Sequence, residues 1–262
     1  MQRTSRLYQQ ILLSGNYRVE TSLVVGESGR LITEKAEILR FGGDAILISS
    51  SGADAGYNES MLISVKTTRR VFADNVPQAG CCTCGEIYVE MLMPLGEIAP
   101  MAMLAPFVRL VSTEDGTCSE WIKKGIYYID TRSNTRNDDG LDILRLHGYD
   151  AMLRANKPYE STTLSFPATD IAVVRDIAGK MGVSLDEECV PNINRGYAVQ
   201  YPGEYSMRET LQYIGAMYAG NWIMNDFGEL QLICLNDLPP ETSLLVDEFG
   251  YRITFADDRI LV

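Results

Sequence analysis

The sequence is poor in basic residues and in long apolar runs. Its 262 residues carry 23 Lys and Arg against 35 Asp and Glu, a formal net charge of −12. Proteins that bind nucleic acid or anionic lipid need clustered basic side chains, so this excess of acidic residues argues against both kinds of partner. The most apolar stretch, residues 91–111, contains three prolines and two charged residues, which argues against a membrane span. We expect a soluble protein made in a cytoplasm, because the first residues do not have the pattern of a targeting signal.

Histidine and the common enzyme motifs are also scarce. The chain has one histidine, His147, and no GxSxG, HExxH, GxxxxGK[ST] or GxGxxG motif. A single histidine in an alternating segment that ends at Gly148 is more typical of a structural side chain than of a catalytic base. We therefore expect no enzyme, and we assign no catalytic, cofactor-binding or metal-binding residues.

Two acidic patterns leave alternatives open. Glu120, Asp130, Asp142 and Asp150 are carboxylates of the kind that a glycosidase uses in pairs, although the sequence does not tell which of them converge. A cell-wall hydrolase that uses two of them is the enzymatic alternative. The segment 137–140, Asn-Asp-Asp-Gly, looks like half of a calcium loop but lacks the spaced acids and the final glutamate of an EF-hand.

Cysteine is present but gathered at one place. Three of the six cysteines, Cys81, Cys82 and Cys84, lie within four residues. A zinc site needs four ligands, usually as two closely spaced pairs, and the chain offers no second pair. A zinc-binding adaptor is one interpretation of the cluster. The other is a half-buried strand in which reduced cysteines act as small apolar side chains.

The negative charge is concentrated in the second half of the chain. Residues 1–132 hold 13 basic and 15 acidic residues, a net charge of −2, whereas residues 133–262 hold 10 and 20, a net charge of −10. One interpretation is solubility. The other is a surface that repels polyanions.

Short alternating segments dominate the first half and predict a mostly antiparallel, β-barrel-like domain. A short helix over residues 4–13, with Thr4 as its N-cap, comes first. Strands are expected at residues 17–25, 30–41, 45–49, 61–66, 85–92, 106–111, 121–131 and 141–148. Turns or loops are expected at residues 26–29, 50–60 and 133–140, the last as a polar hairpin loop.

The second half is predicted to be a smaller α+β domain. Apolar residues recur at helical spacing over 170–181, where Gly182 ends the helix. A second helix is expected over 206–219, with a capping box formed by Ser206 and Glu209 and with Gly220 and Asn221 ending it. A hairpin follows at 222–234, and residues 243–262 look strand-like. We expect domains at residues 1–155 and 156–262.

Several tracts, in order along the chain, resemble a signature of tail hub proteins from phages and prophages of Gram-positive bacteria. The strongest are residues 119–132, 146–155, 206–211 and 220–223, and the weaker ones extend the match over about residues 15–235. The signature residues are Trp121, Gly125, Tyr128, Asp130, Gly148, Tyr149, Asp150, Arg208, Glu209, Gly220, Asn221 and Trp222. We expect these to serve cores, turns and helix caps rather than catalysis.

The resemblance implies a structural protein of a virion or phage-like tail, assembled in the bacterial cytoplasm. Such hubs form a homotrimeric ring that closes the distal end of the tail tube, and each subunit supplies tube-type β-domains. Partners would be two further copies of the chain, a tail tube or distal tail protein, a spike, fibre or tip protein, and a tape measure. DNA would only pass through the lumen, which an acidic surface would help because it does not hold a polyanion. The alternative is another tail-tip component, such as a spike or tube adaptor.

The sequence also departs from this family. Its members are often longer, with an extension that carries a fibre or a cell-wall hydrolase, so we do not expect those activities in residues 1–262. The cysteine cluster at Cys81, Cys82 and Cys84 is not a feature of the family. The pattern leaves open whether the particle is a phage, a bacteriocin-like tail or another injection machine.

Overall fold

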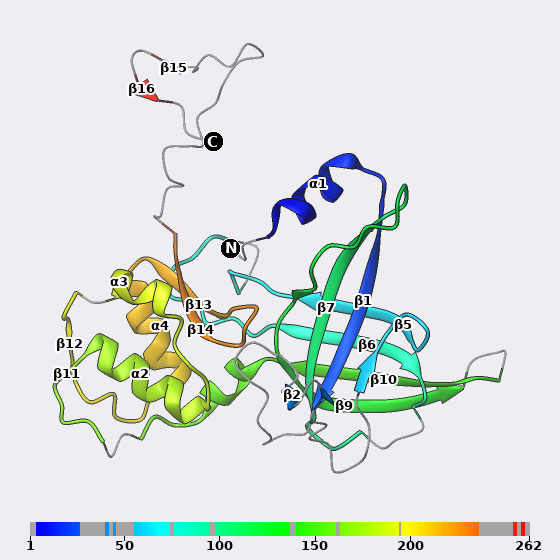
Figure 1. Cartoon of the computed structure of the whole chain (residues 1–262). Coiled ribbons are helices and arrows are strands. Elements are labelled where there is room, and N and C mark those ends of the chain that lie inside the picture. The colour runs from blue at the N-terminus through cyan, green and yellow to red at the C-terminus, as the bar shows by residue number, and fades with distance from the viewer. Residues whose placement is uncertain are drawn as a thin grey trace.

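The computed structural model places a large antiparallel sheet beside a smaller group of helices and a hairpin (Figure 1). This confirms a β-rich α+β fold. The structure describes residues 4–26, 40–41, 44–45, 55–73, 76–94, 98–136, 140–160, 163–193, 195–235, 254–255 and 258–259. Among these residues, no helix has the length and apolar character needed to cross a membrane.

The large sheet has the order β4-β1-β7-β9-β10-β6-β5, with β8 paired to β7. Its strands are β1 (Tyr17–Gly26), β4 (Ala55–Tyr57), β5 (Leu62–Thr68), β6 (Glu86–Leu92), β7 (Met103–Ser112), β8 (Ile122–Lys123), β9 (Tyr127–Arg136) and β10 (Asp142–Tyr149). Every pairing is antiparallel. Within the described residues the sheet is an open path from β4 to β5 and does not close into a barrel.

The sheet bends sharply where β7 meets β9. These two strands share only two registered pairs, Met103 with Tyr128 and Leu104 with Tyr127. As a result, β1 and β7 run steeply across the direction of β5, β6, β9 and β10 (Figure 1). The concave side encloses an apolar core. That core includes Leu23, Ile87, Val89, Met91, Leu104, Tyr127, Ile129, Leu144 and Leu146.

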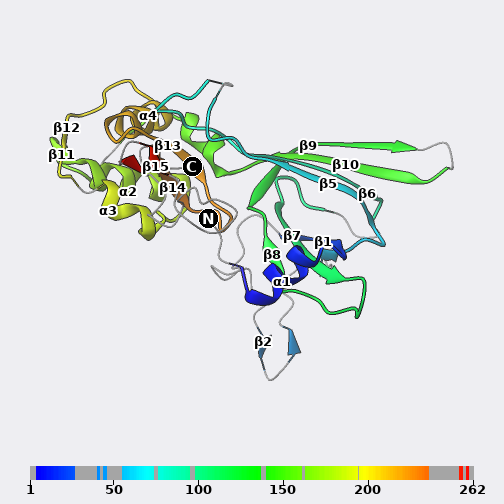
Figure 2. The same ribbon diagram turned by 90° about the horizontal axis from the view of Figure 1, so that it is seen from above.

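Strand β9 pairs with β10 as far as Arg136 and Asp142, near the outer end of the sheet in Figure 2, and β6 lies on the other side of β10 from Ile143 to Tyr149. Residues 133–136 were expected in a polar hairpin loop, but they continue β9 in register with β10. The expectation was wrong because these residues are polar and exposed, since this part of β9 is an edge that pairs with β10 alone among the described strands. Backbone pairing, which side-chain polarity does not reveal, holds them in the strand.

Other strand boundaries also differ from the sequence prediction. The expected strand at 121–131 is divided into β8 and β9, because Gly125 has a φ of 125°, a backbone angle that interrupts a strand. Strand β4 lies inside the expected loop at 50–60. Strand β7 begins at Met103 rather than at Pro106, and Pro106 lies within it, opposite Leu23.

Some sequence predictions fall wholly or largely outside the described residues. These are the turn at 26–29, the strand at 30–41, most of the strand at 45–49, the calcium-like segment at 137–140 and the strand-like tail at 243–262. In these parts the structure describes four short strands. They are β2 (Arg40–Phe41), β3 (Asp44–Ala45), β15 (Thr254–Phe255) and β16 (Asp258–Arg259).

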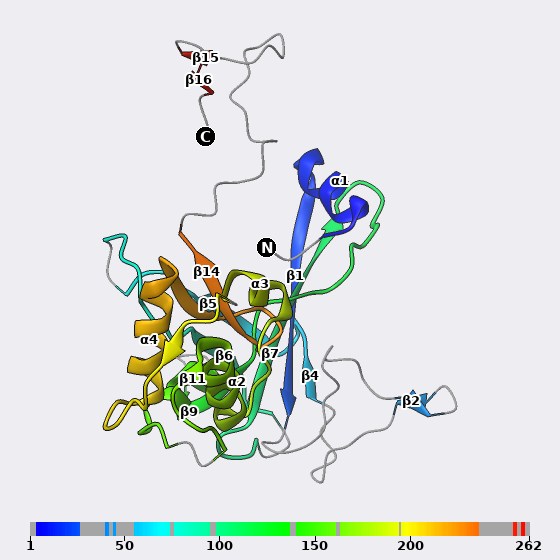
Figure 3. The ribbon, with the colours of Figure 1, turned by 90° about the vertical axis from the view of Figure 1, so that its left-hand side faces the viewer.

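The helices α2, α3 and α4 lie together beside the hairpin β13–β14, whereas α1 lies apart at the start of β1 (Figure 3). The helices are α1 (Arg6–Ser14), η1 (Ala151–Asn156), α2 (Asp170–Met181), η2 (Glu187–Cys189), α3 (Val190–Ile193) and α4 (Met207–Met217). The strands of this part are β11 (Ala168–Thr169), β12 (Ala198–Val199), β13 (Gly220–Met224) and β14 (Leu230–Cys234).

Local signals set most of these helix ends. Helix α2 has the predicted bounds and ends at Gly182, whose φ is 71°. The predicted capping box at Ser206 and Glu209 is present. Two expectations were wrong. Helix α1 is capped by Ser5 rather than Thr4, because the Ser5 hydroxyl accepts the Tyr8 N–H at 3.0 Å.

The second correction concerns the end of α4. Gly220 and Asn221 were expected to end that helix, but the helix stops at Met217 and Gly220 already begins β13. Ala219, with a φ of 48°, makes the turn between the two elements. The short helices η2 and α3 had no counterpart in the sequence prediction.

Residues 80–84, from the first half of the chain, pair with β13 in the second half. The Gly80 N–H donates to the Gly220 carbonyl at 2.9 Å, and the Trp222 N–H donates to the Cys81 carbonyl at 2.8 Å. The Thr83 N–H then donates to the Trp222 carbonyl at 3.2 Å. The division into domains at residues 155 and 156 stays a prediction, and these bonds cross it.

Candidate functional site

Five of the predicted signature residues meet where residues 80–85 cross between the sheet and the helices. We define this place as the junction: residues 80–85 together with Asp150, Arg208, Gly220, Asn221 and Trp222. Its parts come from η1, the first turn of α4 and strand β13. The junction is thus assembled from three stretches of the chain, residues 80–85, Asp150 and residues 208–222, that are more than 50 residues apart in the sequence.

Asn221 is the polar centre of the junction. Its side chain is completely buried. The amide oxygen accepts the Cys81 N–H at 2.8 Å, and the amide nitrogen donates to the carbonyls of Val71 at 3.0 Å and Gln78 at 2.8 Å. A buried amide whose hydrogen bonds are all formed in this way holds the backbone of Val71, Gln78 and Cys81 against β13.

Trp222 is the apolar centre of the junction. It is 0% exposed, and its indole N–H donates to the Leu211 carbonyl of α4 at 2.7 Å. A Cβ at Gly215 would come within 3.0 Å of the ring, so glycine at that position lets α4 lie directly against it. The tryptophan therefore has a packing role with one satisfied polar atom.

Asp150 binds residues 84–85 to the start of η1. Its carboxylate accepts the N–H groups of Gly85 at 2.6 Å and Met152 at 3.0 Å, and the Cys84 thiol at 3.2 Å. Burial raises the pKa of this carboxyl, although the same hydrogen bonds act in the opposite direction. A carboxylate held by backbone N–H groups in this way is a structural cap.

Arg208 joins α4 to both other segments. Its guanidinium donates to the Cys82 carbonyl at 3.2 Å and to the Met152 carbonyl at 3.0 Å. The next residue, Glu209, accepts the Ser206 N–H at 2.7 Å in the capping box. Arg208 thus binds the segments that pack against α4, and Glu209 caps the first turn of the helix.

The cysteine cluster lies in the junction as small packed side chains. Cys81 and Cys82 are buried, Cys84 is half-buried, and Cys82 belongs to the core around Trp222. Burial raises the pKa of the Cys82 and Cys84 thiols, and Asp150 adds to the rise at Cys84. Zinc is bound by the thiolate, which these environments disfavour. In the part of the chain that the structure describes, no three His, Cys, Asp or Glu residues are placed to hold a metal ion.

Three further signature residues lie where β9 and β10 begin to pair. A Cβ at Gly148 would collide with the carbonyl oxygen of Tyr128, at an irregularity in the pairing of β10 with β9. The Tyr128 ring stacks under the Arg154 guanidinium at 4.2 Å. Tyr149 contacts the His147 ring edge-on at 4.7 Å. These positions are structural in the described fold.

The remaining signature residues lie just before β8, between β8 and β9, and on β9. Trp121 is 41% exposed and packs against the Arg109 guanidinium at 4.5 Å. Gly125 has a left-handed φ and adjoins the Tyr127 ring. Asp130 is exposed on β9. The structure does not bring these three residues to the junction.

His147 lies in an aromatic cluster. Its ring stacks on Tyr88 at 4.2 Å, and its Nε2 atom lies 3.7 Å from a Glu86 carboxylate oxygen. Its aromatic neighbours give it a structural position.

Two of the four carboxylates of the hydrolase alternative lie far apart. Asp142 and Asp150 lie at opposite ends of β10, roughly 25 Å apart at the usual rise per residue. This distance is too large for a glycosidase pair, whose carboxyl groups lie within roughly 10 Å of each other. Glu120 accepts the Ser5 N–H at 2.7 Å at the start of α1.

A second contact between the two regions was not predicted from the sequence. The Arg69 guanidinium pairs with Asp226, in the β13–β14 turn, at 2.9 Å. Lys123 of β8 is buried nearby, and burial lowers its pKa to about 8 against the opposing attraction of Asp226 and Glu229. The basic residues that follow β5 were the available signal, but the partner of Arg69 lies 157 positions away.

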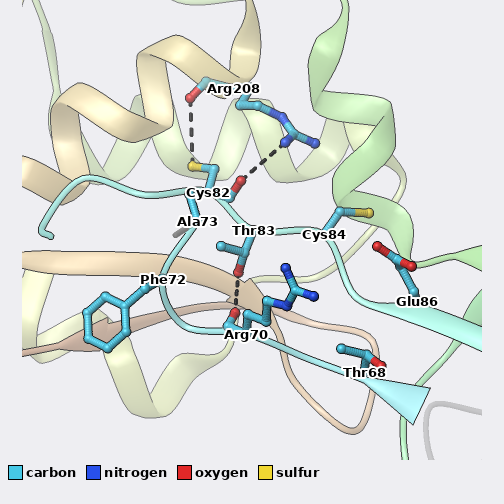
Figure 4. A pocket seen from close by; sticks show the side chains of 9 residues that line it. All are labelled: Thr68, Arg70, Phe72, Ala73, Cys82, Thr83, Cys84, Glu86 and Arg208. Carbon is cyan, nitrogen blue, oxygen red and sulfur yellow. Dashed lines mark hydrogen bonds between the residues drawn. The ribbon is translucent and has the colours of Figure 1, made fainter. Parts of the chain in front are cut away.

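A pocket of about 210 Å³ lies beside the junction (Figure 4). Its walls come from the chain after β5, from residues 82–86 and from the first turn of α4. The lining residues are Thr68, Arg70, Phe72, Ala73, Cys82, Thr83, Cys84, Glu86 and Arg208. The Thr83 hydroxyl donates to the Arg70 carbonyl, which holds the two sides of the pocket together.

Comparison with known proteins gives likeness in fold only. No protein family profile matches the chain, and no curated protein matches it. Among solved structures, it is similar to the 43 kDa tail protein of prophage MuSo2 from Shewanella oneidensis, with a TM-score of 0.50 and 12% sequence identity. The match covers 87% of this chain and 59% of that protein.

Two weaker similarities accompany it. One is to the tail protein from Neisseria meningitidis, with a TM-score of 0.43, 11% identity and coverage of 82% of this chain and 50% of that one. The other is to a chain of the half-lidded PdpA-VgrG complex from Francisella, with a TM-score of 0.45, 7% identity and coverage of 82% and 31%. The chain thus spans less than two thirds of the length of each of these proteins, and it shares a fold with the prophage tail protein.

Proposed function

We propose that the chain is a structural subunit of a phage-type tail, and that it acts as a homotrimeric hub at the distal end of the tail tube. The observation that carries the proposal is the fold shared with a prophage tail protein over 87% of the chain. The described signature residues give independent support, because Asp150, Arg208, Asn221 and Trp222 are engaged in packing, capping and backbone hydrogen bonds. Such residues build a scaffold and leave no reacting group exposed.

In this role the chain would contact two further copies of itself, a tail tube or distal tail protein above, and a spike, fibre or tip protein below. DNA or a tape measure would pass through the ring without specific binding. The net charge of −12 suits that passage, because an acidic lumen repels the phosphate backbone. The protein would reside in the tail of a virion or phage-like particle and would catalyse no reaction.

Mass measurement followed by imaging tests the proposal. The purified protein is examined by light scattering, and the same peak is imaged by negative stain. We expect the mass of three 29.2 kDa chains and a ring with a central hole. The same measurements on a mixture with the tail tube protein would detect assembly that requires the partner.

Other outcomes separate the alternatives. A ring of another size, or a position away from the end of the tube, would favour a spike or tube adaptor. A compact monomer that joins no tail protein and digests cell wall would contradict the tail role and favour the hydrolase.

A further inference from the structure

The pocket beside the junction is lined by two guanidinium groups that lack a carboxylate partner among the described residues. Arg208 donates only to the carbonyls of Cys82 and Met152, and its Nε atom is buried without a hydrogen-bond partner. The side chain of Arg70 forms no hydrogen bond or ion pair with the residues that the structure describes. Two unneutralised cations at one pocket attract an anion.

One acidic side chain lines the same pocket, and it has partners of its own. The Glu86 carboxylate accepts the Tyr88 hydroxyl at 2.9 Å and lies 3.7 Å from the Nε2 atom of His147. The two cysteines of the pocket add no negative charge near neutral pH, because burial keeps the thiols protonated. Among the described lining residues, two arginines thus stand against one glutamate, in a chain whose total charge is −12, and the Asp150 carboxylate lies behind the wall, where it accepts the Cys84 thiol.

The size of the pocket limits what it can hold. Its volume of about 210 Å³ is below the roughly 300–1,000 Å³ of typical small-molecule sites. A short acidic group fits this space. A guanidinium binds such a group best when it is a planar carboxylate, which can accept two parallel N–H donors.

We propose that this pocket binds the carboxylate of an aspartate or glutamate side chain from another protein chain, held between Arg70 and Arg208. The acidic surface of the molecule repels a polyanion such as nucleic acid at long range, whereas a single carboxylate on a polypeptide segment carries little charge to the pocket. The pocket is thus a docking point for an acidic side chain. The inference goes beyond the tail role and does not depend on it.

Arginine-detected NMR tests the proposal on the full-length protein. The Nε–H signals of Arg70 and Arg208 are followed during titration with N-acetylglutamate α-amide, at constant ionic strength. The glutamine counterpart of this probe and inorganic phosphate are titrated in parallel. We expect saturable shifts of both signals with the glutamate probe, and weaker binding of the other two.

Three variants locate the binding. Arg70→Gln removes an exposed cation of the pocket and is expected to weaken binding about tenfold. Arg136→Gln, at an exposed arginine at the end of β9, is the matched control and should leave the affinity unchanged. Glu86→Gln removes the one acid of the pocket and should tighten binding a few-fold. This opposite sign keeps the test informative even where one variant folds poorly.

Three results would overturn the proposal. They are no saturable shift with the glutamate probe, equal affinity for its glutamine counterpart, and tighter binding of inorganic phosphate. The last result would assign the pocket to free anions rather than to a protein side chain. None of these results bears on whether the chain forms a trimeric ring, so the two proposals can fail separately.

Discussion

The two regions of the molecule bury their apolar residues in different ways. The sheet core is formed mainly by strands that lie next to each other along an antiparallel ladder, and its buried residues alternate along β6 and β10. The core around Trp222 instead collects side chains from η1, α2, α4, the β13–β14 hairpin and the Cys81–Cys84 segment. The first core depends on local alternation, and the second depends on contacts between distant segments.

This difference shows which region depends on the other. Residues 80–84 run directly into β6 of the sheet, and they also pair with β13. The core around Trp222 is therefore incomplete until the sheet has positioned this segment. We expect the two regions to unfold in one transition, because each contributes backbone to the other.

Trp222→Ala should have the largest effect on stability, because it acts on the core that depends on distant segments. It removes the largest fully buried side chain and leaves the Leu211 carbonyl without its indole donor. We expect a loss of about 3–5 kcal/mol in the free energy of unfolding, measured by urea denaturation. Trp121→Ala is the matched control, because that side chain is 41% exposed and should cost about 1 kcal/mol or less.

The shape of the same unfolding curve tests the coupling of the two regions. Both fluorescence and circular dichroism should report one midpoint for Trp222→Ala. Two separate transitions would contradict the coupling, because the sheet would then be stable without the junction.

Gly148→Ala tests the sheet region in the same manner. The added Cβ would collide with the Tyr128 carbonyl where β10 and β9 begin to pair. We expect a loss of about 2–3 kcal/mol, since the collision is with backbone that cannot rotate away. Gly56→Ala, on β4 in open space, is the control, and thermal unfolding would reveal the difference. Equal effects at the two glycines would contradict the close packing at Gly148.

The local part of this fold could be predicted from the sequence. The apolar spacing at 170–181 and the capping box at Ser206 gave helix ends because each signal involves neighbours within one or two turns. The hairpin after Trp222 was likewise visible from its turn residues. The divided strand at Gly125 was missed, because a positive φ at glycine leaves the alternation of the flanking residues unchanged.

The junction could be predicted only in part. Asn221 and Arg208 were identified as signature residues, but no local pattern indicated that they form hydrogen bonds with the backbone of Cys81 and Cys82. These pairs are separated by 140 and 126 positions, and they depend on how the sheet turns the chain. Arg70 was missed altogether, because a basic residue at a strand end has the same local pattern whether or not a pocket surrounds it.

Lys123 should make the free energy of unfolding depend on pH above about 8. Its pKa is about 8 in the folded protein, against the usual 10.5. Between these two values the unfolded chain binds more protons, so this lysine adds stability as the pH rises from about 8 to 10.5. The raised pKa of the junction thiol Cys84 acts in the opposite direction above its ordinary value. The contribution of Lys123 is therefore measured by comparing the wild type with a Lys123 variant, because both proteins contain Cys84 and its effect cancels.

The expected result is that the stability of the wild type relative to Lys123→Met increases across this range. The increase should be on the order of 1–2 kcal/mol, less than the full shift, because the protein relaxes around the charged form of a buried lysine. Urea denaturation at several pH values measures it, and Lys124→Met controls for the loss of one positive charge. A pH-independent difference between wild type and Lys123→Met would show that this lysine is not held in a costly charged state.

Gly179→Ala should give the smallest effect, and with the opposite sign. Gly179 is exposed in α2, and a Cβ there meets nothing within 4 Å. Alanine loses less backbone entropy than glycine in a helix, so we expect a gain of about 0.5–1 kcal/mol. Because the two regions unfold together, this gain should raise the midpoint of the whole transition, seen equally by a sheet probe and a helix probe. A rise confined to the helix probe would show that the α2 region unfolds independently of the sheet.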